Sequence, residues 1–209
     1  MGKVLVITGP SGVGKGTVIR GLRGRMPQIE LSVSATTRPP RAGERDGIDY
    51  HFLSDAEFDR LLREGAFVEH AAYSGNRYGT LRCELERRLK RGVPVVLEIE
   101  VQGARQVRER MPDAVTIFIA PPSEKALQAR LIGRGTDPAA QVQERMRTAA
   151  RELQSRGEFD HVVVNDRLEQ AIEEIVSIVR RALCPGDRGG GLNADAKLSS
   201  PNHEECEPS

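Results

Sequence analysis

Short apolar runs alternate with longer amphipathic stretches along most of this chain. The runs are rich in valine and isoleucine, as expected for strands buried on both faces of a parallel sheet; they lie at 4–8, 93–100, 115–120 and 161–164. Apolar residues at helical spacing between and after these runs predict helices at about 15–25, 80–91, 123–131, 138–153 and 168–183. Strands that alternate with helices in this way predict an α/β fold with a parallel sheet core.

The segment from 29 to 89 has a different pattern. An alternating run at 29–36 predicts one strand, and the proline-, glycine- and arginine-rich stretch at 37–50 predicts a surface loop that enters a short strand near Tyr50. Ser54 and Glu57 have the spacing of a capping box for a helix that ends at Gly65. A strand is expected at 67–73, followed by a turn at 74–79.

The first apolar run leads into a glycine-rich loop that ends in lysine and opens a helix. Three glycines let successive backbone N–H groups point into one concavity, and the helix N-terminus and Lys15 add positive charge. A phosphate site is therefore predicted, rather than an ordinary glycine-rich strand-to-helix turn. Its nucleotide-binding residues are Gly9, Pro10, Ser11, Gly12, Val13, Gly14, Lys15, Gly16 and Thr17.

One position departs from the usual phosphate-loop pattern. The residue after the lysine usually carries a hydroxyl that touches Mg²⁺, whereas here it is Gly16, and the hydroxyl follows at Thr17. We therefore expect Mg²⁺ to be held mainly by phosphate oxygens and water, without a dedicated set of protein ligands.

Composition narrows the function classes. A chain of 209 residues with 31 basic and 30 acidic side chains gives no electrostatic case for a nucleic-acid partner. The three cysteines are too scattered for a disulfide framework or a metal site. Neither a membrane-spanning run nor a signal peptide is predicted, so the expected compartment is the cytoplasm. Residues 185–209 are almost free of apolar side chains and predict a disordered tail; protein partners cannot be inferred.

At this point the chain resembles the guanylate kinase family over about residues 4–183. Besides the phosphate loop, the motifs that carry the resemblance are S-V-S-A-T-T-R-P-P-R-A-G-E at 32–44, D-Y-H-F at 49–52, F-V-E at 67–69, S-G-N-R-Y-G-T at 74–80, E-I-E-V-Q-G at 98–103, I-A-P-P-S at 119–123, R-G-T at 134–136 and V-N-D at 164–166.

The resemblance implies transfer of the γ-phosphate of ATP to GMP, with dGMP as a related substrate and Mg²⁺ as cofactor. It also implies a phosphate-loop NTPase-type three-layer fold with an inserted GMP-binding region that contains a small sheet, and a short lid. In this division 1–184 is one domain, made of a core (1–31, 90–128 and 151–184), the GMP-binding region (32–89) and the lid (129–150).

Several residues acquire roles from the resemblance. The GMP phosphate is expected to meet two arginines and two tyrosine hydroxyls, and guanine to be recognised by four other side chains; the substrate residues are Ser34, Arg38, Arg41, Tyr50, Glu69, Tyr78, Thr80 and Glu100. Thr80 is also placed to cap a helix, and the two roles are compatible. Glu100 stands where the family usually has aspartate.

The donor side is assigned in the same way. Arg130, Arg134 and Arg145 match lid arginines, and Asn165 matches the adenine side of the ATP site. Lys15, Arg38, Arg134 and Arg145 are the expected catalytic residues. Glu98 lies where an acid could orient Mg²⁺-bound water, although two acids at a strand end are common.

Two other functions stay open. Another kinase on this scaffold would phosphorylate a different nucleotide or a sugar phosphate, and a panel of acceptors would identify it. A non-catalytic protein-interaction module is the other alternative, and failure to bind ATP would favour it.

Overall fold

The main sheet organises the molecule, and a computed structural model describes residues 2–73, 75–132 and 139–184, the side chains of 139–142 excepted. Its five strands run in the order β2-β7-β1-β8-β9 and pair in parallel throughout. Their bounds are β1 Val4–Thr8, β2 Glu30–Leu31, β7 Val95–Glu98, β8 Val115–Ala120 and β9 His161–Val164. The predicted parallel core is confirmed.

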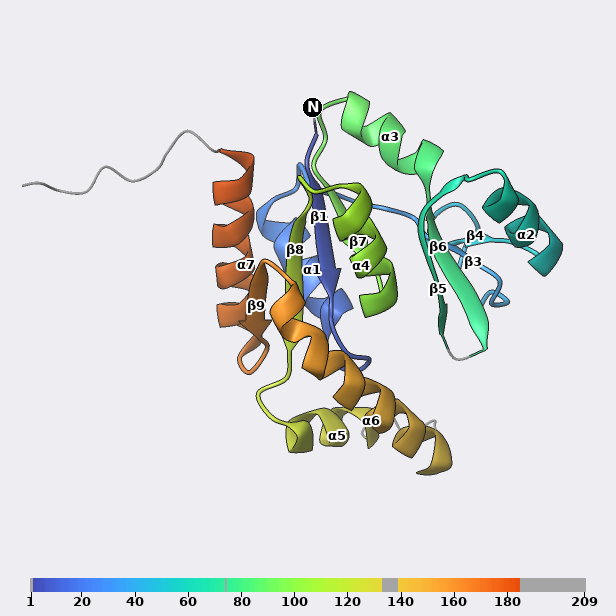
Figure 1. The fold of residues 1–209 in the computed structure, drawn as a ribbon. Coiled ribbons are helices and arrows are strands. Elements are labelled where there is room, and N and C mark those ends of the chain that lie inside the picture. Colours follow the sequence, from blue (N-terminus) through green and yellow to red (C-terminus); the bar gives the residue numbers. More distant parts are fainter. Residues whose placement is uncertain (1, 74, 133–138, 185–209) are drawn as a thin grey trace, which may run out of the picture.

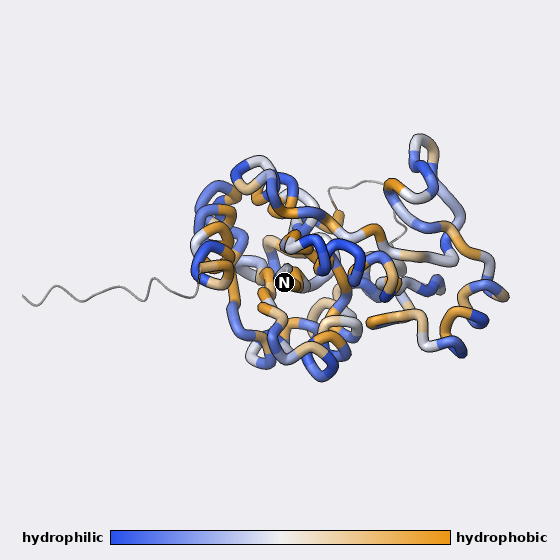
Figure 2. Tube along the Cα trace, turned by 90° about the horizontal axis from the view of Figure 1, so that it is seen from above, coloured by the Kyte–Doolittle hydropathy of each residue, from blue (hydrophilic) through white to orange (hydrophobic). Residues whose placement is uncertain are grey.

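Helices cover both faces of this sheet and make three layers (Figure 1). Leu5 and Ile7 of β1 pack with α1 (Lys15–Arg25) and α7 (Leu168–Leu183), whereas Val4 and Val6 pack with α3 (Arg82–Lys90) and α4 (Val101–Arg110). This alternation follows from the two-residue period of a strand. Figure 2 shows the apolar segments gathered inside the ring of helices, whose outer sides are mostly hydrophilic.

A second, four-stranded sheet projects from one side of the core (Figure 1). Its order is β4-β3-β6-β5, with β3 Ala35–Thr36, β4 His51–Phe52, β5 Phe67–Tyr73 and β6 Asn76–Leu81. Helix α2 (Asp55–Arg63) begins at the predicted capping box, and its Phe58 stacks on Phe67 at 4.5 Å between ring centroids. This small cluster is separate from the two cores that flank the main sheet.

The chain leaves β8 for a pair of helices. Ser123 caps α5 (Glu124–Ile132) by accepting a hydrogen bond from the Ala126 N–H at 3.1 Å. Helix α6 (Ala139–Gln154) and a short 3₁₀ helix, η1 (Ser155–Glu158), then lead back to β9. None of the helices in the described part of the chain is both long and apolar enough to cross a membrane.

The predicted bounds of the elements are wrong where the chain passes between the main sheet and the small sheet. The single strand expected at 29–36 is two short strands, because β2 pairs with β7 in the main sheet and β3 pairs with β4 and β6 in the small one. The turn expected at 74–79 is largely strand β6, so the following helix begins at Arg82 and not at 80. No helix was predicted at α4, where Gly103 and several arginines weaken the apolar periodicity.

Candidate active site

The glycine-rich loop between β1 and α1 has the geometry that a phosphate site requires. Gly9 and Gly14 have φ values of +139° and +99°, which favour glycine, and a Cβ atom at Gly9 would lie 2.3 Å from the Ile119 carbonyl oxygen. The loop therefore lies directly against β8, at the carboxyl end of the sheet. Helix α1 begins at Lys15 and directs its N-terminal amides toward the loop.

Side chains from distant parts of the chain hold this loop in place. Lys15 curls over it and donates from Nζ to the Gly9 carbonyl oxygen at 2.6 Å. The Val13 carbonyl oxygen accepts hydrogen bonds from the amide of Asn165 at 2.8 Å and from Arg130 at 3.3 Å. Arg145 on α6 donates to the Ser11 hydroxyl at 2.8 Å. Arg134 and the tail at 185–209 lie outside the described residues.

A pocket that we call the arginine pocket opens between the small sheet and the main sheet. It brings together Ser34, Arg38, Arg41, Tyr50, Glu69 and Tyr78, joined by Ala71, Tyr73, Gly79, Lys15, Glu98, Ile99 and Glu100. Thr80 lies behind Glu69 and is fully buried. Seven of the eight substrate residues expected from the sequence thus line one pocket, and the eighth supports it.

Arg38 and Tyr50 give the arginine pocket its anion-binding character. The Arg38 guanidinium donates to Glu44 Oε1 at 2.9 Å and to the Pro39 carbonyl oxygen at 2.7 Å, and it lies 5.3 Å from the centroid of the Tyr50 ring. Burial, and next the charge of Glu98, raise the pKa of the Tyr50 hydroxyl, which therefore stays protonated as a hydrogen-bond donor at neutral pH.

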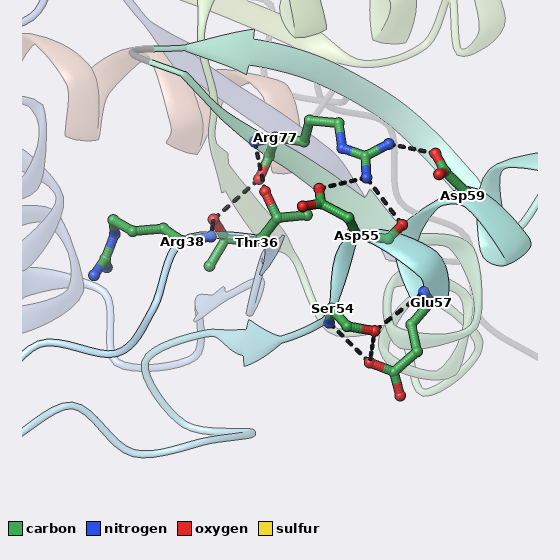
Figure 3. Close-up of polar contacts among 8 residues, drawn as sticks. Thr36, Arg38, Ser54, Asp55, Glu57, Asp59 and Arg77 are labelled. Carbon is green, nitrogen blue, oxygen red and sulfur yellow. Dashed lines mark hydrogen bonds and ion pairs between the residues drawn. The ribbon is translucent and has the colours of Figure 1, made fainter.

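Arg77 supports the segment that carries Arg38 (Figure 3). Its guanidinium joins β6 to the start of α2 by donating to the Asp55 carboxylate at 2.6 Å and to the Asp59 carboxylate at 2.5 Å. Its carbonyl oxygen accepts a hydrogen bond from the Thr36 hydroxyl at 3.0 Å, and that hydroxyl in turn accepts one from the Arg38 N–H at 3.1 Å. The backbone of Arg38 is therefore fixed through Thr36 to the Arg77 cluster.

A β-bulge aims Glu69 into the arginine pocket. On β6, Leu81 pairs with Phe67 and the adjacent Thr80 pairs with Glu69, so Val68 is the extra residue on β5. Glu69, Ala71 and Tyr73 then all face the pocket. The Thr80 hydroxyl donates to Glu69 Oε1 at 2.7 Å, which shows that Thr80 is a strand residue and not a helix cap; the cap position is Leu81.

The Glu69 carboxyl group holds a proton more tightly than an ordinary glutamate. It is only 2 % exposed, and this burial raises its pKa to about 7, although the hydrogen bonds from Thr80 oppose the rise. A hydrogen-bond donor bound in the pocket would favour the charged form and lower this pKa again.

The phosphate loop has a pocket of its own, and the two pockets share Lys15, Glu98 and Glu100. Burial raises the pKa of Glu98, while Lys15 opposes that shift. Lys15 therefore lies where the two pockets meet, so its ammonium group can reach an anion placed in either of them.

The fit for Mg²⁺ depends on few protein groups. A Cβ atom at Gly16 would be 3.7 and 3.8 Å from the two carboxylate oxygens of Glu98, so this acid lies beside the junction of the loop and α1. The Thr17 hydroxyl accepts a hydrogen bond from Arg20 at 3.1 Å. Among the described residues no cluster of three acidic, histidine or cysteine side chains is placed to hold a metal. This donor set suits an ion coordinated mainly by phosphates and water.

Three residues at the site were missed by sequence reasoning. Glu44 pairs with Arg38, and Tyr73, to which the sequence analysis assigns no role, lines the arginine pocket. Glu152 on α6 approaches Glu100; burial and then that charge raise its pKa to about 7. Glu44 lies within the 32–44 motif and could have been found there, whereas Glu152 has no local signal.

A phosphate loop at the carboxyl edge of a parallel sheet, facing a second anion pocket, defines a phosphate-loop protein of the nucleotide-kinase architecture. The family model described as guanylate kinase matches residues 1–182. A guanylate kinase from Rubrobacter xylanophilus is 52% identical over 89% of this chain and 97% of its own length. One from Thermobifida fusca is 50% identical over 85% of this chain and 90% of its own.

A solved structure supports the same assignment. The crystal structure of guanylate kinase from Anaplasma phagocytophilum is 37% identical, covers 91% of each chain and has a TM-score of 0.73. The chain therefore belongs to the guanylate kinase family.

Proposed function

We propose that this protein transfers the γ-phosphoryl group of ATP to GMP or dGMP and releases ADP and the nucleoside diphosphate. The observation that carries the proposal is the shared border of the two pockets at Lys15. ATP binds with its phosphates on the loop, and GMP binds with its phosphate beside Arg38. The residues at 32–89 form the GMP-binding region, those at 129–150 the lid, and the rest of 1–184 the core.

The chemistry is a direct displacement. A GMP phosphate oxygen forms a bond to the γ-phosphorus while the bond between that phosphorus and the β,γ-bridging oxygen breaks, and its electron pair leaves with ADP. The attacking oxygen is already anionic, so no side chain has to remove a proton. Lys15 and the arginines stabilise the charge on the transferred group. Glu98 and Thr17 are the protein groups that would lie beside a Mg²⁺ ion carried by the phosphates, and such an ion would supply further neutralisation of charge.

Base selection rests on Glu69. Guanine presents its N1–H and its exocyclic amine as donors to a carboxylate, whereas adenine presents a bare acceptor at N1. A buried carboxylate left without donors is costly, and mismatches of this kind reject the wrong ligand by a factor on the order of 10⁴. Ser34 and Glu100 complete the base site.

A coupled ADP-release assay with ATP and Mg²⁺ tests the proposal, with GMP, dGMP, AMP, CMP and UMP offered in parallel. We expect fast turnover with GMP and dGMP alone. Turnover confined to another acceptor would contradict the guanine assignment and leave the phosphate loop standing. No turnover with any acceptor, in a folded protein that does not bind ATP, would overturn the whole proposal.

A further inference from the structure

Gly103 on α4 lies directly against the Glu69 carboxylate. A Cβ atom built at Gly103 would be 2.1 Å from Glu69 Oε2 and 2.9 Å from its carboxyl carbon, far inside van der Waals contact. Gly103 is buried near the start of the helix, where glycine is a poorer helix former than alanine. Helix α4 thus carries a poor helix former at a position where an added side chain would meet the carboxylate.

Side chains of α4 also fix the strand on either side of Glu69. Arg110 donates to the Val68 carbonyl oxygen at 2.6 Å. The Gln106 amide donates to the His70 carbonyl oxygen at 2.6 Å and accepts from the His70 N–H at 3.2 Å. Because β5 is held to α4 on both sides of Glu69, the strand cannot slide to relieve a clash at Gly103.

We propose that Gly103 is a positioning residue for base recognition, because its missing side chain leaves the space that the Glu69 carboxylate occupies when it meets the base. This inference rests on the role of Glu69 proposed above. An added methyl group would push the carboxylate away from α4 and break its 2.7 Å hydrogen bond with Thr80. Since the displaced atoms are the end of a side chain, the fold accommodates the change and base recognition does not.

The test is a double-mutant cycle on Gly103→Ala and Glu69→Asp, with kcat/KM for GMP, KM for ATP and thermal unfolding measured for all four proteins. Gly103→Ala alone is expected to lower kcat/KM for GMP by about 10- to 100-fold with KM for ATP unchanged. In the Glu69→Asp background, whose shorter side chain withdraws the carboxylate, the same change should cost less than about twofold.

Gly24→Ala is the matched control, because Gly24 also lies in a helix and an added Cβ atom would meet nothing within 4 Å. It should leave the kinetics unchanged. An equal loss of kcat/KM from Gly103→Ala in both backgrounds would show a general effect on α4 and overturn the inference. So would unchanged GMP kinetics in Gly103→Ala, or a loss that falls on ATP. A wild-type protein without preference for GMP would instead contradict the proposed function.

Discussion

The loop pocket and the arginine pocket are built in different ways. The loop pocket, which lies over the phosphate loop, is lined mainly by one segment between Pro10 and Thr17 that follows β1 of the main sheet; Arg20, Glu98 and Glu100 complete it. The arginine pocket takes residues from β5, β6, the loop after β3 and the end of β7, and five of its thirteen residues lie on strands of the small sheet, which has its own minor core.

This difference separates affinity for phosphate from choice of substrate. A loop that presents backbone N–H groups and the Lys15 ammonium group to phosphate is expected to bind a polyphosphate whatever base it carries. Side chains gathered from several elements can distinguish one base from another, but each depends on a supporting contact, such as Glu44 for Arg38 and Thr80 for Glu69. Changes in the arginine pocket should therefore alter the acceptor and leave ATP binding intact.

The largest expected effect comes from the residue at the border of both pockets. Lys15→Ala should lower kcat on the order of 10³-fold, because it removes a cation that both phosphate chains approach. Steady-state kinetics and circular dichroism measure this, with exposed Lys90→Ala as the matched control. Near wild-type turnover in a folded Lys15→Ala variant would contradict the site assignment.

A change confined to the arginine pocket should affect GMP and leave ATP binding unchanged. Arg38→Ala is expected to lower kcat/KM for GMP on the order of 10²-fold, since a half-buried cation of the arginine pocket is lost, while ATP binding is unchanged. Titration with each nucleotide measures both effects. Arg45→Ala, an exposed arginine of the same loop, is the control and should behave as wild type.

Glu69 should impose a cost on stability that depends on pH. Its pKa of about 7 lies above the ordinary 4.5, so the folded protein binds this proton more tightly and its stability falls as the pH rises from about 4.5 to 7. Glu69→Gln should therefore stabilise the protein by about 3 kcal/mol at pH 8 and by far less at pH 5, while GMP turnover is lost. Urea unfolding at both pH values would detect the difference; equal gains at both would exclude the carboxyl group as its source.

Protonation of Glu69 should also affect the binding of GMP. Below pH 7 Glu69 is mostly protonated in the free protein, whereas guanine requires the carboxylate. GMP binding at pH 6.5 should therefore release a proton, and the affinity for GMP should fall by up to about tenfold for each pH unit below 7. Calorimetry in buffers of different ionisation enthalpy measures this release. Glu69→Gln retains the titrations of GMP and Glu152, so the release from Glu69 is the difference between the two proteins.

The smallest effect is expected for Arg77, which joins the small sheet to α2. Arg77→Met removes the hydrogen bonds to Asp55 and Asp59, partners that are largely exposed, so about 1 kcal/mol of local stability should be lost. Hydrogen exchange should rise in α2 and the small sheet and stay unchanged in β1 and β8. Arg60→Met, which removes only an exposed pair within α2, should change exchange less. A rise spread over the main sheet would contradict the separation of the two regions.

The two pockets also differ in how far they could be predicted. The spacing from Gly9 to Lys15 is local, so the phosphate loop, β1 and α1 follow from the sequence, and the bounds of β8, β9 and α7 were predicted as well. The residues of the arginine pocket had to be taken from a family resemblance, because contacts such as Glu69 with Thr80 join residues that no local pattern links. Glu152 was missed for the same reason, whereas α4 was missed because Gly103 and several arginines weaken its apolar periodicity.

The bulge at Val68 has a consequence for how this gene can change over generations. Because Val68 is the extra residue on β5, Phe67 and Glu69 pair with adjacent residues of β6, and the loss of the Val68 codon would leave Glu69, Ala71 and Tyr73 on the pocket face. The loss or gain of one codon after Glu69 would instead turn Ala72 toward the pocket in place of Ala71 and Tyr73. The interval from 69 to 73 should therefore keep its length where its composition drifts, whereas the interval from 67 to 69 can become one residue shorter.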